Sequence, residues 1–349
     1  MKTFLIAGAQ RSGTTLLSVM LGKHSEIHID GKSVAYRLVS CFQYYENVLP
    51  YNLNHSSGDI QSWLIENDYK GRLTELLDYQ NLQDYGSARE IIQQGIAERL
   101  KANGKTVFGD KTPNMEQFLA KYLLLVPEAK FIHIVRDGRA VAASQAKRAH
   151  RNMYLAAQEW VDSNIAGLYN QAMIGEERYK LIRYEDLLQD PETVAKTICA
   201  FLDIPFEPAM IAQQAGENEA TNYVKSTFDA SKIEAFKSEL SQHQIKKLER
   251  IQGPLLEKMG YQTEFPVDAD AYKPLSEFQR IWYHQRENTR QLFIGKRMGM
   301  VNRQNVEVAI PLKTRVKTFA FELGRDLLPE RVYRKVFRKR WIKKLRLPK

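Results

Sequence analysis

Gly8 and Gly13 form the Gly-x-x-x-x-Gly frame of a phosphate-binding loop close to the start of the chain. The apolar residues before Gly8 predict a short strand and Thr14 begins a helix, so backbone N–H groups and a helix N-terminus converge on one point. Nucleoside triphosphatases carry a lysine after the second glycine, where it holds the β- and γ-phosphates. Here that position is Thr14, and the strongest cation of the loop is Arg11. The loop therefore predicts a phosphate ligand other than a triphosphate.

A second strand–turn–helix segment offers another anion site. The apolar run from Phe131 ends at Arg136, Asp137-Gly138 forms a tight turn, and Ser144 falls in the early turns of the next helix. The carboxyl ends of parallel strands form the ligand edge of an open α/β sheet. A planar guanidinium and a hydroxyl at that edge predict a second phosphate site. One ligand with two separate phosphate ends fits both segments.

These segments resemble the sulfotransferases that use 3′-phosphoadenosine 5′-phosphosulfate (PAPS). The 5′-phosphosulfate loop of that family looks like residues 10–15, and its 3′-phosphate motif looks like residues 135–139 with Ser144. Residues 109–113 (Gly-Asp-Lys-Thr-Pro) and 183–192 resemble its bacterial and tyrosylprotein branch. The motifs occur in the family's order, which makes the resemblance specific.

The resemblance implies in-line transfer of a sulfuryl group from PAPS to an acceptor hydroxyl or amine. Negative charge grows on the leaving phosphate, so positioning and cationic stabilisation should carry the catalysis. Arg11 and Lys111 are assigned to this stabilisation, and Lys111 also to contact with the sulfuryl group. No metal is required, and the sequence has no cluster with metal-ligand spacing. The predicted donor-binding residues are Arg11, Ser12, Gly13, Thr14, Thr15, Arg136 and Ser144.

Asp30 is our predicted general base. Tyrosylprotein-type enzymes carry a catalytic glutamate shortly after the first helix, where this chain has Lys32, and Asp30 is the nearest carboxylate. His24, His28 and His133 are alternatives because the unperturbed pKa of imidazole suits the task. His133 is on an apolar strand, so we expect it to be a buried core residue.

Alternating strands and helices predict an α/β fold, a P-loop-type parallel sheet with helices on both faces. A helix is expected from Pro113, with Thr112 as its cap, and another from Pro191 to about Leu202. A helix is also expected near 275–292, with Trp282 and Tyr283 able to pack on the core. Strands are expected at 3–7, 105–110, 131–136 and 179–184, with helices after the first three.

Residues 33–104 do not follow the alternation of strands and helices. They are polar and rich in tyrosine, and a helix is expected at 88–101. We interpret them as a helical insertion over the donor site that contributes to the acceptor pocket. The alternative is that the tyrosines pack the insertion onto the core. With it, the catalytic domain is predicted to span residues 1–265.

The C-terminal extension, residues 266–349, carries the excess charge of the chain. The net charge is +10, and residues 331–349 contain ten Lys or Arg and no acid. Aromatic and apolar residues recur there every four positions, which predicts a basic amphipathic helix. Such a helix suits peripheral binding to an anionic membrane, and docking on the catalytic domain is the alternative. Nucleic acid is not expected as a partner.

Other features predict a cytoplasmic protein, with possible peripheral contact at the inner membrane surface. The first strand begins near the N-terminus, no run is long enough to span a membrane, and only two cysteines occur. The acceptor is expected to be a glycan, a lipid-linked sugar or a tyrosine. The alternative functions are a P-loop kinase or NTPase-like enzyme and an inactive nucleotide-binding, membrane-associated scaffold.

Overall fold

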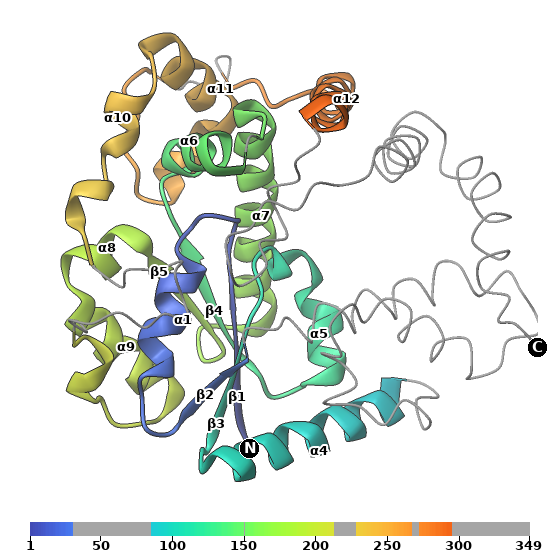
Figure 1. Cartoon of the computed structure of the whole chain (residues 1–349), viewed down its shortest axis with the longest axis vertical. Helices are drawn as coiled ribbons and strands as arrows, with labels where there is room; N and C mark the ends of the chain where they lie inside the picture. Colours follow the sequence, from blue (N-terminus) through green and yellow to red (C-terminus); the bar gives the residue numbers. More distant parts are fainter. Residues whose placement is uncertain (31–84, 150, 213–227, 267–271, 295–349) are drawn as a thin grey trace, which may run out of the picture. The chain divides into compact units, whose positions relative to one another are not determined.

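The computed structural model describes residues 1–30, 85–149, 151–212, 228–266 and 272–294 (Figure 1). The chain divides into two compact units. The first comprises 1–136, 162–216 and 224–233, and the second comprises 137–161, 217–223 and 234–349. The tyrosine-rich part of the predicted insertion and the basic segment 331–349 lie outside the described residues. The predicted domain boundary at residue 265 therefore stays a prediction.

A five-stranded parallel sheet forms the centre of the first unit, which confirms the α/β class. The order across the sheet is β2-β3-β1-β4-β5. Four strands match the expected ones, and β2 was missed because its sequence, Ile-His-Ile-Asp, has only 4 residues. The strands are β1 (Lys2–Ala7), β2 (Ile27–Asp30), β3 (Val107–Lys111), β4 (Lys130–Val135) and β5 (Tyr179–Arg183).

Helices α1 (Thr14–Gly22), α8 (Tyr184–Gln189) and α9 (Pro191–Leu202) cover one face of this sheet (Figure 1). Alternate strand residues such as Phe4 and Ile6 point to this face and share a buried cluster with the helices. Helix α9 confirms the expected helix, and its Asp190 side chain accepts a hydrogen bond from the Thr193 N–H at 3.0 Å. Short 3₁₀ helices follow at η3 (Pro208–Met210) and η5 (Ala230–Lys232).

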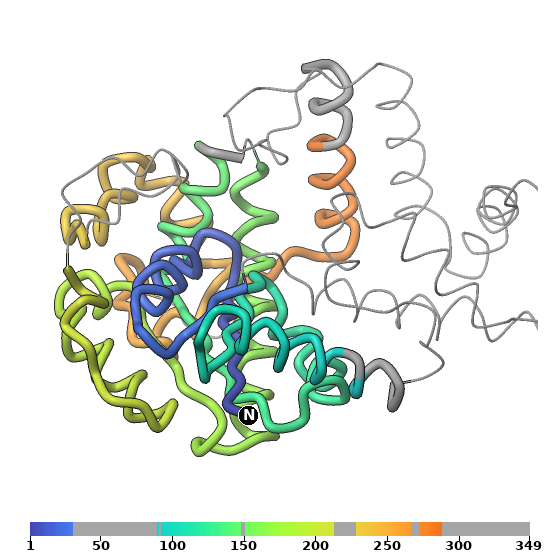
Figure 2. Tube along the Cα trace, turned by 60° about the horizontal axis from the view of Figure 1, so that its bottom comes forward, coloured from blue at the N-terminus to red at the C-terminus, as the bar shows by residue number. Residues whose placement is uncertain are grey.

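Helices α4 (Tyr85–Asn103) and α5 (Leu119–Leu125), with the first unit's part of α7 (Met153–Ile174), lie on the other face. Helix α4 confirms the helix expected at 88–101. Gly167 of α7 lies so close to the sheet that a Cβ there would be 2.2 Å from the His133 ring. Figure 2 shows from a second side how β1 leads from the N-terminus into the loop before α1.

The connection after β3 corrects one expectation. Thr112 does not cap a helix, because its hydroxyl donates to the Asp110 carboxylate at 2.7 Å. Asn114 then adopts a left-handed conformation, with φ 61°. A 3₁₀ turn, η2 (Met115–Phe118), follows, and the α-helix begins only at Leu119. A left-handed residue ends the run of helical backbone angles, so no helix can start at Pro113.

The second unit is helical in its described part. It contains α6 (Gly138–Ala149), the start of α7, α10 (Ala235–Glu239), α11 (Gln242–Lys258) and α12 (Glu277–Ile294). Helix α12 confirms the helix expected near 275–292. Its Tyr283 packs against the unit's core, whereas Trp282 is 54% exposed. None of the described helices is long and apolar enough to cross a membrane.

Candidate functional site

The loop from Gly8 to Gly13, here called the glycine loop, joins β1 to α1 and packs closely against Ile134 and Tyr184. Gly8 and Gly13 have φ values of 150° and 102°, which side chains rarely allow. A Cβ on Gly8 would lie 2.2 Å from the carbonyl oxygen of Ile134 on β4. A Cβ on Gly13 would lie 2.4 Å from the ring of Tyr184. Both positions of the predicted phosphate-loop frame therefore require glycine in this fold.

Helix α1 begins without a side-chain cap, because Gly13 at the N-cap position has no side chain to offer. The N–H groups in its first turn have no acceptor within the helix, so they form a positive end suited to an anion. Thr15 there is exposed, whereas Thr14 is buried. The Ser12 N–H donates to the Ala9 carbonyl at 3.0 Å, so that amide closes the turn of the loop.

Arg11 and Arg136, the two arginines predicted to bind phosphate, lie side by side. Nη1 of Arg136 donates to the Arg11 carbonyl, and Nη2 to the Lys232 carbonyl, both at 3.3 Å. The Arg136 guanidinium also lies 4.5 Å from the centre of the Tyr184 ring, a cation–π contact. Tyr184 thus contacts both Arg136 and the second glycine of the loop.

Arg11 has a strained backbone. Its φ is 76°, a left-handed value that costs a non-glycine residue about 1–3 kcal/mol. Its side chain is exposed at the loop. Strain of this kind persists only where the surroundings hold the backbone firmly.

Lys111 ends β3 beside the strand that carries the loop. In the register of the two strands it pairs with Ile6, two residues before Gly8. Its side chain is half-buried, and burial lowers the pKa of Lys111 while the neighbouring Asp110 opposes that shift. A partly dehydrated ammonium gains more from an anionic ligand than a fully hydrated one. The sheet thus brings Lys111 to the same edge as the glycine loop.

Thr112 and Asn114, which follow Lys111, form hydrogen bonds with β1 and with the glycine loop. The Thr112 N–H donates to the Ile6 carbonyl at 3.0 Å, and the Asn114 N–H donates to the Gly8 carbonyl at 2.9 Å. The Gln10 N–H donates to Oδ1 of Asn114 at 3.1 Å. Asn114 was missed at the sequence level, although Pro113-Asn114 is a typical turn dipeptide.

Asp30, our predicted general base, is 2% exposed at the end of β2. Its Oδ2 accepts a hydrogen bond from Nη1 of Arg99 on α4 at 2.8 Å. The assignment stays a prediction, and both the burial and the ion pair argue against it, because a general base must reach the acceptor. His24 and His133 are fully buried, as expected for His133, and His28 stacks on a neighbouring ring.

Glu116 is a buried carboxyl group that the sequence did not indicate. It is 1% exposed in η2, and its Oε1 accepts a hydrogen bond from the Ser163 hydroxyl. Burial raises the pKa of Glu116 to about 7, and hydrogen bonds from Ser163 and from the backbone of Gly8 and of Glu116 itself oppose the shift. The Glu116 carboxyl, which contacts Gly8 at the start of the glycine loop, thus loses its proton near neutral pH.

Replacing Glu116 with glutamine should therefore change how stability depends on pH. The folded pKa is raised, so the contribution of Glu116 is fully present below its ordinary value of 4.5 and lost as the pH rises through about 7. We expect the wild type to lose about 1 kcal/mol or more relative to Glu116→Gln between pH 5 and pH 8. Urea unfolding of both proteins at the two pH values measures this. Equal losses in Glu116→Gln and in the wild type would contradict it, and Glu128→Gln at an exposed position is the control.

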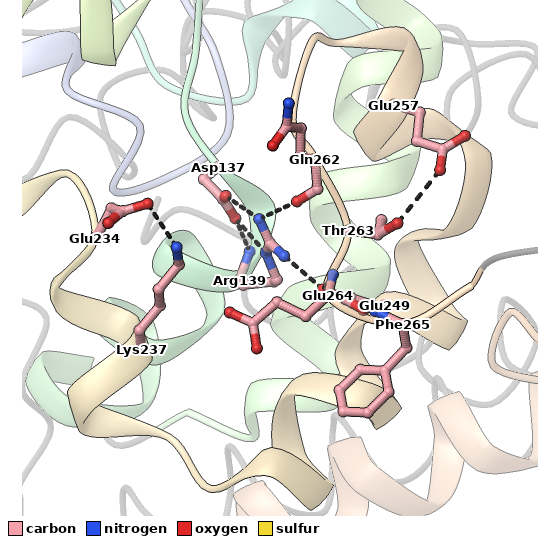
Figure 3. A network of polar contacts seen from close by, with 10 residues as sticks. All are labelled: Asp137, Arg139, Glu234, Lys237, Glu249, Glu257, Gln262, Thr263, Glu264 and Phe265. Carbon is pink, nitrogen blue, oxygen red and sulfur yellow. Dashed lines mark hydrogen bonds and ion pairs between the residues drawn. The ribbon is translucent and has the colours of Figure 1, made fainter.

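In the second unit, Arg139 of the predicted 3′-phosphate motif is committed to internal contacts (Figure 3). It is 3% exposed and forms ion pairs with Asp137 at 2.6 Å and Glu249 at 2.5 Å. It also donates to the Gln262 carbonyl at 2.9 Å. This network joins the start of α6 to α11, so Arg139 has a structural role. Ser144 is half-buried on α6 in this unit, and its predicted pairing with Arg136 stays a prediction.

The profile of one protein family, described as "Sulfotransferase family", matches residues 4–208. That is more than half of the chain, and the match includes the glycine loop, Lys111 and Arg136. The chain belongs to the sulfotransferase family.

Among the residues that the structure describes, no group of three or more His, Cys, Asp or Glu could hold a metal ion.

Two relatives of this sulfotransferase-family chain are protein-tyrosine sulfotransferases. The Drosophila melanogaster protein is 26% identical over 250 residues, which cover 68% of this chain and 45% of that protein. Protein-tyrosine sulfotransferase A of Caenorhabditis elegans is 26% identical over 240 residues, which cover 64% and 56%. The chain therefore spans about half the length of these two relatives.

Among solved structures, the chain is similar to the sulfotransferase domain from the curacin biosynthetic pathway. The TM-score is 0.51 at 24% identity, and the similarity covers 75% of this chain and 99% of that domain. At this identity the similarity supports the fold, a parallel sheet with flanking helices.

Proposed function

We propose that this protein transfers the sulfuryl group of PAPS to a hydroxyl or amine of an acceptor. The observation that carries the proposal is the glycine loop with its uncapped helix start, which lacks the lysine of a triphosphatase after Gly13. In place of that lysine, Lys111 and Arg136 stand at the ends of the two strands beside β1. This arrangement suits a ligand with separate phosphate ends better than it suits the three linked phosphates of ATP.

The proposed roles follow from where charge develops. The backbone N–H groups of Thr14 and Thr15 and the Arg11 side chain hold the 5′-phosphosulfate, together with Ser12 and Gly13 of the same loop. Lys111 contacts the sulfuryl group and stabilises the charge that grows on the leaving phosphate. Arg136 and Ser144 bind the 3′-phosphate. PAPS supplies the group that is transferred, and the protein supplies orientation and positive charge.

The acceptor is proposed to be a glycan, a lipid-linked sugar or a tyrosine. The names of the two relatives above make a tyrosine peptide the first acceptor to test. A carbohydrate sulfotransferase of Mus musculus, 26% identical over 165 residues, supports testing glycans next. Of the proposed acceptor-side insertion, 33–104, the part 33–84 lies outside the described residues.

Calorimetric titration with adenosine 3′,5′-bisphosphate tests the proposal, with ATP plus Mg²⁺ as the comparison. We expect bisphosphate binding that is independent of Mg²⁺ and tighter than ATP binding. A preference for ATP with Mg²⁺ would support the kinase or NTPase alternative and end the PAPS proposal. Bisphosphate binding without turnover on any of the three acceptor classes would favour the inactive scaffold.

Replacing Arg136 with alanine should weaken bisphosphate binding by about 1–3 kcal/mol, the usual loss for a hydrogen bond to a charged group. Arg136→Lys keeps the charge but loses the planar fork, so we expect an intermediate loss. Calorimetry on the three proteins measures the effect. Unchanged affinity in Arg136→Ala would remove the assignment of Arg136 to the 3′-phosphate.

A further inference from the structure

Asn114 contacts the glycine loop at two points, on either side of Ala9. Its N–H donates to the Gly8 carbonyl at 2.9 Å, and its Oδ1 accepts from the Gln10 N–H at 3.1 Å. One side chain and its own amide therefore fix both ends of the first half of the loop. This residue lies 104 positions from Gln10 in the sequence, so the contact exists only in the folded protein.

The contact of residue 114 with the glycine loop depends on its being asparagine. Asn114 has a φ of 61°, in the left-handed region that asparagine tolerates far better than most residues with a side chain. This conformation turns the chain after β3, so that Asn114 presents both its amide and its side-chain oxygen to the loop. Alanine would lose the acceptor and strain the backbone, whereas glycine would lose only the acceptor.

The two hydrogen bonds act next to the strained residue of the loop. Gln10, whose N–H is held by Asn114, directly precedes Arg11, and the Arg11 carbonyl is held by Nη1 of Arg136 at 3.3 Å. Hydrogen bonds thus hold the peptide before Gln10 on one side of Arg11 and the Arg11 carbonyl on the other. Without the contact, the Ala9–Gln10 peptide is free to rotate, and this rotation lets the loop relax the strain at the next residue, Arg11.

We propose that Asn114 is a positioning residue that holds the glycine loop, and Arg11 in particular, in the donor-binding conformation. Asn114 also follows Lys111 by three residues, so its contact with Gly8 fixes the end of β3 relative to the loop. The binding part of this inference rests on the proposed use of PAPS. The conformational part concerns the loop alone and can be measured without any nucleotide.

Asn114→Gly is the decisive variant because glycine keeps the left-handed backbone and the N–H bond to Gly8. Asn103→Gly is the matched control: it removes a side-chain hydrogen bond of 2.8 Å to the Arg99 carbonyl at the exposed end of α4. Each variant is purified as the full chain, and its thermal midpoint is recorded. Amide hydrogen exchange of residues 8–13 is then measured without nucleotide, and bisphosphate affinity by calorimetry.

We expect faster exchange in residues 8–13 and bisphosphate affinity lowered about 5- to 10-fold in Asn114→Gly, as for the loss of one hydrogen bond. Asn103→Gly should change neither quantity, even if its thermal midpoint falls. Unchanged exchange in Asn114→Gly, or faster exchange with wild-type affinity, would overturn the proposal and leave Asn114 a stabilising contact only. If the wild type itself fails to bind bisphosphate, the PAPS proposal fails, and the exchange experiment still decides whether Asn114 holds the loop.

Discussion

Lys111→Ala is expected to lower the turnover number about 10²–10³-fold, the usual cost of removing one donor that stabilises transition-state charge. Lys111 ends β3 beside the strand that carries the glycine loop, and its ammonium is half-buried. In the proposed reaction, its charge matters most when the sulfuryl group leaves and the phosphate oxygen becomes negative. Adenosine 3′,5′-bisphosphate lacks the sulfuryl group, so its affinity should fall much less than turnover.

Steady-state kinetics with PAPS and calorimetry with the bisphosphate separate these two effects. Lys101→Ala, which removes an exposed cation at the end of α4, is the matched control and should leave both values unchanged. Lys111→Arg keeps a cation and should recover part of the turnover. Lower bisphosphate affinity with an unchanged turnover number would instead mean that Lys111 holds the donor in its ground state and has no special role in transfer.

Gly13→Ala is the second large effect that we expect, on both stability and donor binding. At φ 102° an alanine is strained, and its Cβ would lie 2.4 Å from the buried Tyr184 ring. Left-handed strain and overpacking together should lower the free energy of unfolding by about 2–5 kcal/mol. Relief of the clash requires the start of α1 to move, which displaces the N–H groups that would bind phosphate. Bisphosphate binding should therefore be lost or greatly weakened.

Gly104→Ala separates the strain from the clash. Gly104 has a φ of 62°, but a Cβ there would meet nothing within 4 Å. Its replacement should cost about 1–2 kcal/mol and leave bisphosphate affinity unchanged. Urea unfolding of both variants measures the difference. The assignment of the larger cost to Tyr184 can be checked in a Tyr184→Ala background, where Gly13→Ala should become less costly. If Gly13→Ala costs no more than Gly104→Ala, the close packing of the loop against Tyr184 has no energetic role.

Local sequence patterns predicted the strands and helices well where the pattern was strong. Apolar runs identified β1, β3, β4 and β5, and Asp190 before Pro191 correctly marked the start of α9. The four residues of β2 carry too little signal, since a strand this short depends on its pairing with β3 for stability. The helix expected from Pro113 was wrong because the loop contacts of Asn114, which are tertiary, determine the backbone there.

The family motifs, the glycine frame and the absence of a lysine after Gly13 can be read from the chain before it folds, because they are properties of residue type and short spacing. Which polar groups form internal contacts is visible only in the folded chain. Asp30 pairs with Arg99, 69 positions away, and Arg139 pairs with Glu249, 110 positions away. Such pairs depend on which distant segments the fold brings together, and each partner by itself resembles a free functional residue. The same holds for Asn114, whose role in the loop comes entirely from the packing of β3 beside β1.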